Sequence, residues 1–109
     1  REALCQIVWW CATSAEGMES VAAGGEPVRI YAPDDEMDAR AVGRLTGRSV
    51  DQLAEQMTQA QTRLRAAARN LADHHASVFQ HGDGRADSAL QCVEELSRRW
   101  QECLGELQA

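Results

Sequence analysis

The last quarter of the sequence constrains the fold most, because residues 86–107 carry a regular apolar repeat. Steps of four, three, four, three and four residues separate Ala89, Val93, Leu96, Trp100, Cys103 and Leu107. A repeat averaging about 3.5 residues keeps one stripe of a helix turned toward a partner along its whole length. Such a stripe is not stable facing water. We therefore predict a helix over residues 85–107 that packs against other helices.

The composition is that of a soluble, globular, single-domain protein. Of the 109 residues, 44% are apolar and 26% are charged, which suffices for one modest core. The longest apolar run, residues 7–12, is far shorter than the roughly twenty residues that cross a bilayer, so we predict no membrane insertion. The formal net charge of −6 argues against nucleic acid as a partner. Because the chain opens on Arg1 rather than Met, we expect it to be a piece of a larger protein.

Four cysteines lie in the two end segments, at Cys5, Cys11, Cys92 and Cys103. Their spacings fit neither a zinc knuckle nor a compact secreted disulfide framework. We interpret them as reduced thiols that pack as small apolar residues in a cytoplasmic protein. The alternative is a disulfide between the first and last helices, from Cys5 or Cys11 to Cys92 or Cys103.

A first helix is predicted over residues 2–23, where two neighbouring rows of apolar residues make a broad face. A face of this width favours contact with two neighbouring elements. Trp10 falls on these rows and is predicted to lie in the core, with Trp9 at its margin. A pair of glycines followed by a proline ends the helix.

The connection over residues 24–48 has the weakest pattern. Residues 28–31 could be briefly extended, but a lone four-residue strand has nothing to pair with. Acidic residues after Pro33 suit a helix start, and apolar residues then recur in steps of four, which favours a short extra helix over residues 34–45. We interpret the acidic cluster as a solvated helix start, because it lacks the glycine and the distal glutamate of a calcium loop.

A second long helix is predicted over residues 49–80. A capping box of the form S-x-x-Q opens it at Ser49. Apolar residues, Leu64 and Leu71 among them, then alternate in steps of three and four to its end. The breakers in residues 81–84 predict a tight turn that folds the last helix back antiparallel to this one.

Three striped helices joined by turns bury their stripes most simply as an all-α, antiparallel, left-handed three-helix bundle. The predicted core landmarks are Trp10, Leu64, Leu71, Leu96 and Trp100. In this arrangement the indole rings of Trp10 and Trp100, supplied by the two end helices, lie together in the core.

The end helices carry the pattern of a known family. Residues 86–104 contain a heptad with leucines, then Trp100, then a further leucine, and they resemble the third helix of a spectrin repeat. The first helix, with its tryptophan after Leu4 and Ile7, is similar to the first helix of that family. Residues 50–78 resemble its second helix. The first connection is longer than such repeats usually need.

The resemblance implies a non-catalytic role, because spectrin-like repeats act as spacers and docking surfaces in cytoskeletal scaffolds and in signalling proteins. We therefore expect a scaffold repeat that binds protein partners, is monomeric as an isolated domain and needs no cofactor. Exposed apolar side chains left over from the seams would mark a docking face, and the candidates are Trp9, Leu90 and Leu104. Alternatively, these three side chains only widen the core.

A second interpretation of the function is a free-standing helical adaptor or chaperone. Such a protein would bind an amphipathic segment of its partner along an apolar face. Neighbouring sequence would distinguish it from a scaffold repeat, since repeats lie beside similar repeats.

An enzyme would have to use the histidines, Ser77 or the cysteines. His74 and His81 are seven residues apart and could share a helix face as a weak metal or acid–base pair, with His75 nearby. We predict instead that His74 is a partly buried seam residue and that His81 sits loosely at a helix end. No phosphate-binding loop or nucleophile motif is recognisable. We therefore predict no catalytic, metal-binding or cofactor-binding residue.

Overall fold

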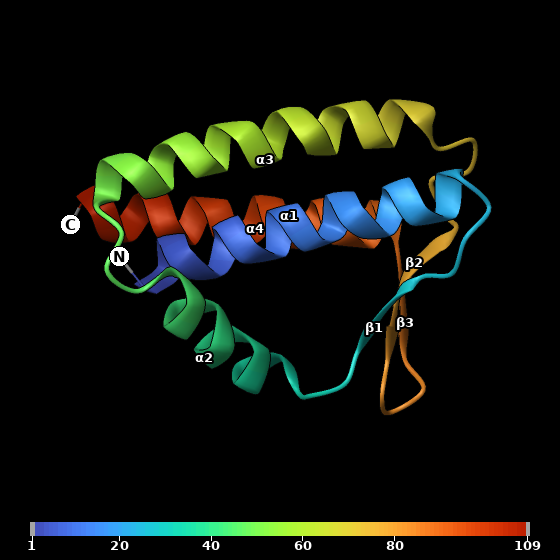
Figure 1. Cartoon of the computed structure of the whole chain (residues 1–109), viewed down its shortest axis with the longest axis horizontal. Coiled ribbons are helices and arrows are strands. Elements are labelled where there is room, and N and C mark those ends of the chain that lie inside the picture. The colour runs from blue at the N-terminus through green and yellow to red at the C-terminus, as the bar shows by residue number, and fades with distance from the viewer. Residues whose placement is uncertain (1, 109) are drawn as a thin grey trace.

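The computed structural model describes residues 2–108, with side chains described up to residue 105. This part of the chain forms four helices and a three-stranded sheet: α1 (Glu2–Ala22), β1 (Val28–Ile30), α2 (Asp34–Leu45), α3 (Val50–Asn70), β2 (Ser77–His81), β3 (Ala86–Ser88) and α4 (Ala89–Gln108) (Figure 1). The predicted all-α three-helix bundle is therefore wrong. Leu107 of the predicted seam lies outside the described side chains.

Helix α1 is the centre of the molecule. Helices α2, α3 and α4 and strand β2 all contact it, and Ile7, Ala15 and Met18 on this helix have no exposed surface. The broad apolar face expected from the sequence is thus covered from several sides. Helices α1 and α3 run in the same direction, while α4 runs opposite to both (Figure 1). The predicted antiparallel packing of the first two long helices is also wrong.

The sheet joins two distant parts of the sequence. Strand β1 pairs in parallel with β2, with Ile30 opposite His81, and β2 pairs antiparallel with β3. The extended segment 28–30 therefore finds its partner in residues that the sequence predicts as the end of the second helix. That helix, α3, ends at Asn70, ten residues before the predicted end. Val78 is buried as a strand residue against α1 and not on a helix stripe.

A glycine in α1 seats the sheet on the helix. A Cβ atom at Gly17 would lie 2.7 Å from the carbonyl oxygen of Val78. Real Cβ atoms do not approach backbone so closely, so only glycine lets β2 come this near to α1. Glycine destabilises the helix at this position by up to about 1 kcal/mol relative to alanine.

The predicted core landmarks differ in burial. Trp10, Leu71 and Leu96 are buried, whereas Leu64 and Trp100 are only partly buried. Among the described side chains, the aromatic neighbours of Trp10 are Trp9, 4.8 Å away between ring centroids, and Phe79, 5.9 Å away. Trp100 is not among these neighbours, so the predicted packing of Trp10 against Trp100 in the core is wrong.

The buried stripe of α4 is displaced from the predicted heptad. Cys92 is buried where the repeat predicts Val93, and Val93 is 38% exposed. With Ala89, Leu96 and Cys103 also buried, the stripe is rotated, which leaves Val93 on a flank of the helix. Strand β3 runs directly into α4, so the helix begins at Ala89 without an intervening loop.

Helix starts follow local sequence rules. The capping box predicted at Ser49 is present, with reciprocal hydrogen bonds to Gln52. Ser88 and Gln91 make the same pair of bonds at the start of α4. The short helix predicted over residues 34–45 is present as α2. Among the helices described, none has the length and apolar content that a membrane span requires.

Candidate functional site

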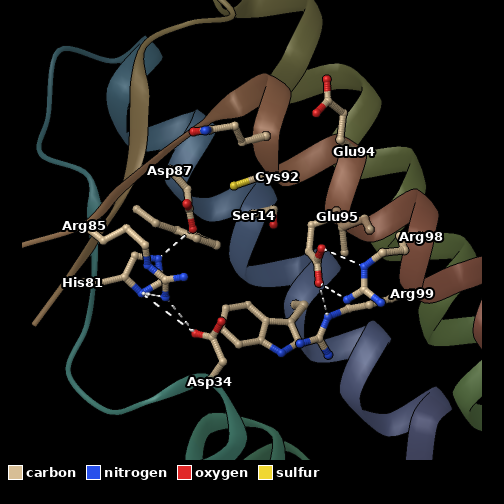
Figure 2. A pocket seen from close by; sticks show the side chains of 14 residues that line it. Ser14, Asp34, His81, Arg85, Asp87, Cys92, Glu94, Glu95, Arg98 and Arg99 are labelled. Carbon is tan, nitrogen blue, oxygen red and sulfur yellow. Dashed lines mark hydrogen bonds and ion pairs between the residues drawn. The ribbon is translucent and has the colours of Figure 1, made fainter. Parts of the chain in front are cut away.

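A cavity with a volume of about 540 Å³ lies between α1, the sheet and α4. We call it the His81 pocket (Figure 2). Its uncharged wall is formed by Trp10, Ser14, Phe79, Gln91, Cys92 and Leu96, and its polar rim by Asp34, His81, Arg85, Asp87, Glu94, Glu95, Arg98 and Arg99. Cavities of this size hold small molecules in many proteins.

A buried histidine lies at the sheet end of the pocket. The His81 side chain is 5% exposed, with Nε2 2.6 Å from Asp87 Oδ2 and Nδ1 3.2 Å from the Arg85 guanidinium (Figure 2). A guanidinium can only donate, so Nδ1 accepts and Nε2 carries the proton that is donated to Asp87. Asp34 lies 3.4 Å from Arg85 and 3.9 Å from His81 Nδ1. The ring is thus fixed in one tautomer between two carboxylates.

The β2–β3 hairpin brings these groups together. His81 ends β2 and Asp87 lies on β3, and the turn between them uses Gly84 at a φ of +91°, which favours glycine. The backbone N–H of Arg85 donates to the side chain of Asp83, which fixes the turn. Parallel pairing with β1 then places Asp34, at the start of α2, beside the hairpin.

The arginines of α4 close the other end of the pocket. The Arg99 guanidinium lies 5.5 Å from the centroid of the Trp10 ring and donates to Asp38 at 3.1 Å and to Glu95 at 3.2 Å. The Trp10 indole N–H donates to the same Asp38 oxygen at 2.5 Å. Hydrogen bonds from Arg98, and then from Arg99, hold the pKa of Glu95 below its usual value. Both arginines are therefore already bonded to carboxylates.

Cys92 faces the pocket but is not activated as a nucleophile. Burial, together with the charge of Asp87, raises the pKa of the Cys92 thiol to about 12, against a hydrogen bond with Ser14 that lowers it. A nucleophilic cysteine needs the opposite shift. Both ring nitrogens of His81 are engaged by other residues, so it does not serve as a base for this thiol. The Cys92 thiol is therefore not prepared for covalent catalysis.

A second cavity, the α3–α4 groove, has a volume of about 310 Å³. It is lined by Met57, Gln61, Leu64, Arg65 and Ala68 of α3, by Val93, Leu96, Ser97 and Trp100 of α4, and by Cys11 of α1. Arg65 is the one charged residue of this lining. Leu96 lines both cavities, so they lie on the two flanks of α4. Both α3 and α4 pack on α1, and the groove is left between them.

Exposed apolar side chains extend the groove along both helices. On α4, Leu90, Val93 and Leu104 are 42%, 38% and 37% exposed. Steps of three, seven and four residues join Leu90, Val93, Trp100 and Leu104, so these four share one flank of the helix. Val50, at the start of α3, is also exposed.

Of the three histidines and Ser77, which an enzyme would need, only His81 lines a cavity, whereas Cys92 lines the same pocket and Cys11 the groove. His74, His75 and Ser77 are exposed beyond the end of α3. A partly buried His74 and a loosely held His81 are both wrong predictions, because this segment is a turn and a strand rather than a helix. Among the side chains of residues 2–105, no three from His, Cys, Asp or Glu converge as metal ligands would. The four cysteines are buried thiols, so their packing as small apolar residues is confirmed.

Two of the three predicted docking residues, Leu90 and Leu104, extend the groove flank of α4. Trp9 is partly buried against Trp10 and lines neither cavity. Sequence reasoning missed the partners of His81, although one signal was available. Residues 77–81 and 85–88 flank a glycine-containing turn, and that pattern predicts a β-hairpin as readily as a helix connection.

Comparisons of this chain with protein-family models, with curated proteins and with solved structures find no match.

Proposed function

We propose that this chain is a non-catalytic protein-binding module that holds an amphipathic helix of a partner protein in the α3–α4 groove. The exposed apolar flank of α4 carries the proposal. Leu90, Val93 and Leu104 are each more than a third exposed, and they lie in one row beside a groove. Apolar rows of this kind on a protein surface mark interaction sites.

The groove has the dimensions of a helix-binding site. The α3 lining runs from Met57 to Ala68, about 17 Å at 1.5 Å per residue, and the exposed row on α4 from Leu90 to Leu104 runs about 21 Å. A partner helix of about 18 residues is long enough to cover both. A helix presents apolar anchors at positions i, i+3, i+4 and i+7 along one stripe. Seated between α3 and α4, such a helix would cover Val93, Leu104 and the exposed edge of Trp100.

The polar chemistry of the chain supports a binding role over a catalytic one. The hydrogen-bonding nitrogens of His81 are occupied, and the raised pKa of Cys92 keeps its thiol protonated at neutral pH. The scaffold role within a larger cytoplasmic protein stays a prediction. Buried cysteine thiols are consistent with a cytoplasmic location.

A synthetic peptide tests the groove. The probe is a fluorescent amphipathic peptide of about 18 residues, with leucines on one helical stripe and mainly glutamine elsewhere, and its scrambled form is the negative control. Fluorescence anisotropy measures the dissociation constant. Ser97→Arg, which places a guanidinium inside the groove, should weaken binding by about tenfold. Thr62→Arg, on the exposed side of α3 outside the groove lining, should leave it unchanged.

Two outcomes would contradict the proposal. One is that the native chain binds the amphipathic and the scrambled peptide equally. The other is self-association: if sedimentation shows a dimer that Ser97→Arg converts to a monomer, the groove is an interface between copies of this chain rather than a site for a partner helix.

A further inference from the structure

The His81 pocket carries an excess of negative charge. Its rim and the side chains that bind the rim arginines supply six carboxylates, from Asp34, Asp38, Asp87, Glu94, Glu95 and Glu102, against three guanidinium groups. Low-dielectric walls around a charged cleft concentrate its field. The pocket therefore attracts cations before any specific contact forms.

The rim arginines are already bonded to acids. Arg85 is bonded to Asp34, while Arg98 and Arg99 are bonded to acids on α4 and, for Arg99, to Asp38. An anionic ligand would have to displace these carboxylates, and it would leave them unpaired at the pocket rim.

Acceptor atoms, in contrast, are free. Asp87 uses only Oδ2 for His81, and in the described part of the chain its other oxygen has no partner. Within the same residues Glu94 makes no hydrogen bond or ion pair. These two carboxylates offer the unoccupied acceptors that a donor-bearing ligand needs.

The uncharged wall suits the body of an organic molecule. Trp10 and Phe79 are 7% and 3% exposed, with ring centroids 5.9 Å apart, and both line the pocket. The Trp10 ring already holds one cation, since the Arg99 guanidinium lies over it. Aromatic walls favour apolar groups and cations alike.

From this combination we infer that the His81 pocket binds a small organic cation, a primary amine carried on an apolar body. The ammonium group bonds to the free oxygen of Asp87, with Glu94 supplying further negative charge. The apolar body lies against Trp10 and Phe79. This site is independent of the α3–α4 groove, which lies on the other flank of α4, so either can fail without the other.

Three probes of matched shape test the inference on the native chain. Phenethylamine is the cation, 2-phenylethanol is the neutral analogue and 3-phenylpropionate is the anion. Titration calorimetry at neutral pH measures each affinity, and backbone NMR shifts locate the binding. Phenethylamine should bind at least about tenfold more tightly than the alcohol, the anion should bind weakest, and the shifts should fall on β2, β3 and the first half of α4.

Variants assign the contact. Asp87→Asn, checked for folding by circular dichroism, should weaken phenethylamine binding by about tenfold or more, while Glu55→Gln on the exposed face of α3 should not change it. If Asp87→Asn fails to fold, Glu94→Gln tests the inference instead, because Glu94 has no structural partner to lose. This variant should weaken phenethylamine binding by at least about twofold. The inference is overturned if the amine binds no better than the alcohol, or if the folded carboxylate variant binds as the native chain does.

Discussion

The two flanks of α4 differ in the recognition that they allow. The α3–α4 groove is lined by uncharged side chains apart from Arg65, with Val93 and Leu104 exposed along it. The His81 pocket is ringed by charges around the buried Trp10. Apolar burial has no direction and selects a shape, whereas charges select a sign and respond to salt. One helix thus presents two surfaces that can be altered separately.

The two tryptophans should show the largest contrast between the flanks. Trp10→Ala is expected to lower the free energy of unfolding by about 3–5 kcal/mol, because it removes a buried ring that packs on Phe79 and hydrogen-bonds to Asp38. Trp100→Ala, at the partly buried groove margin, should cost about 1–2 kcal/mol. Urea denaturation measures both losses. Equal losses would place Trp100 as deep in the core as Trp10.

Gly17 offers a way to damage the pocket and spare the groove. Gly17→Ala should lower the free energy of unfolding by about 1–3 kcal/mol, because the new methyl group meets the Val78 carbonyl. Gly43→Ala in α2, where a Cβ meets nothing within 4 Å, should instead raise it by up to about 1 kcal/mol. Thermal and urea unfolding measure both changes.

The same Gly17 variant should also separate the two binding activities. Phenethylamine binding should weaken, since β2 must shift, while binding of the amphipathic peptide should stay as in the native chain. A stable Gly17→Ala variant with the native affinity for phenethylamine would show that the close packing of β2 on α1 does not determine the shape of the pocket.

The buried thiols of Cys11, at the groove, and Cys92, at the pocket, should make stability fall at high pH. Burial raises their pKa values from 9.0 to about 11 and about 12. The folded state therefore holds these protons more tightly than the unfolded state does. The contribution of these raised pKa values to the free energy of unfolding is fully present below pH 9. It is lost as the pH rises toward the folded pKa values, by at most about 1.4 kcal/mol per pH unit for each thiol.

Single variants assign the two thiols in this titration. Cys11→Ala and Cys92→Ala should each flatten the pH profile of unfolding measured in urea between pH 9 and pH 11. Only Cys92→Ala should also flatten the part above pH 11. A native profile that stays level from pH 9 to pH 11 would mean that the thiols are less buried than the structure places them.

Salt should have the smallest effect and should act on one flank alone. Raising NaCl from about 0.02 M to 0.5 M should weaken phenethylamine binding several-fold, because it screens the carboxylates around the pocket. Binding of the glutamine-rich peptide in the groove should change by less than about twofold, since apolar burial is little screened. Calorimetry measures the affinity for phenethylamine at each salt concentration, and fluorescence anisotropy measures the affinity for the peptide. Equal salt responses would remove the distinction between the flanks.

The helical part of this molecule could be predicted because its signals are local. The capping box at Ser49 and the acidic start of residues 34–45 each depend on neighbours within one helical turn. The apolar periodicity then extended the prediction too far. Leu71 and Val78 continue the steps of three and four, yet Leu71 caps α3 and Val78 lies in a strand.

The sheet and the pocket could not be read in this way, because their contacts are not local. Strand β1 is three residues long, and its pairing with β2 depends on residues beyond two intervening helices. Asp34 looked like an ordinary helix start, and only the assembled sheet brings it to His81. The exposed positions of Leu90 and Leu104 beside the seam were open to prediction, since helical geometry alone places them there.

The parallel pairing of Val28 with Phe79 has a consequence for the order of folding. Helices α2 and α3 lie between the paired strands in the sequence, so this contact closes a long loop. Such contacts form late in folding. During synthesis, the ribosome releases α1, α2 and α3 before β2 exists, and these helices can begin to pack while one wall of the amine site is still untranslated. A bound amine would therefore report that the nascent chain has reached its final topology.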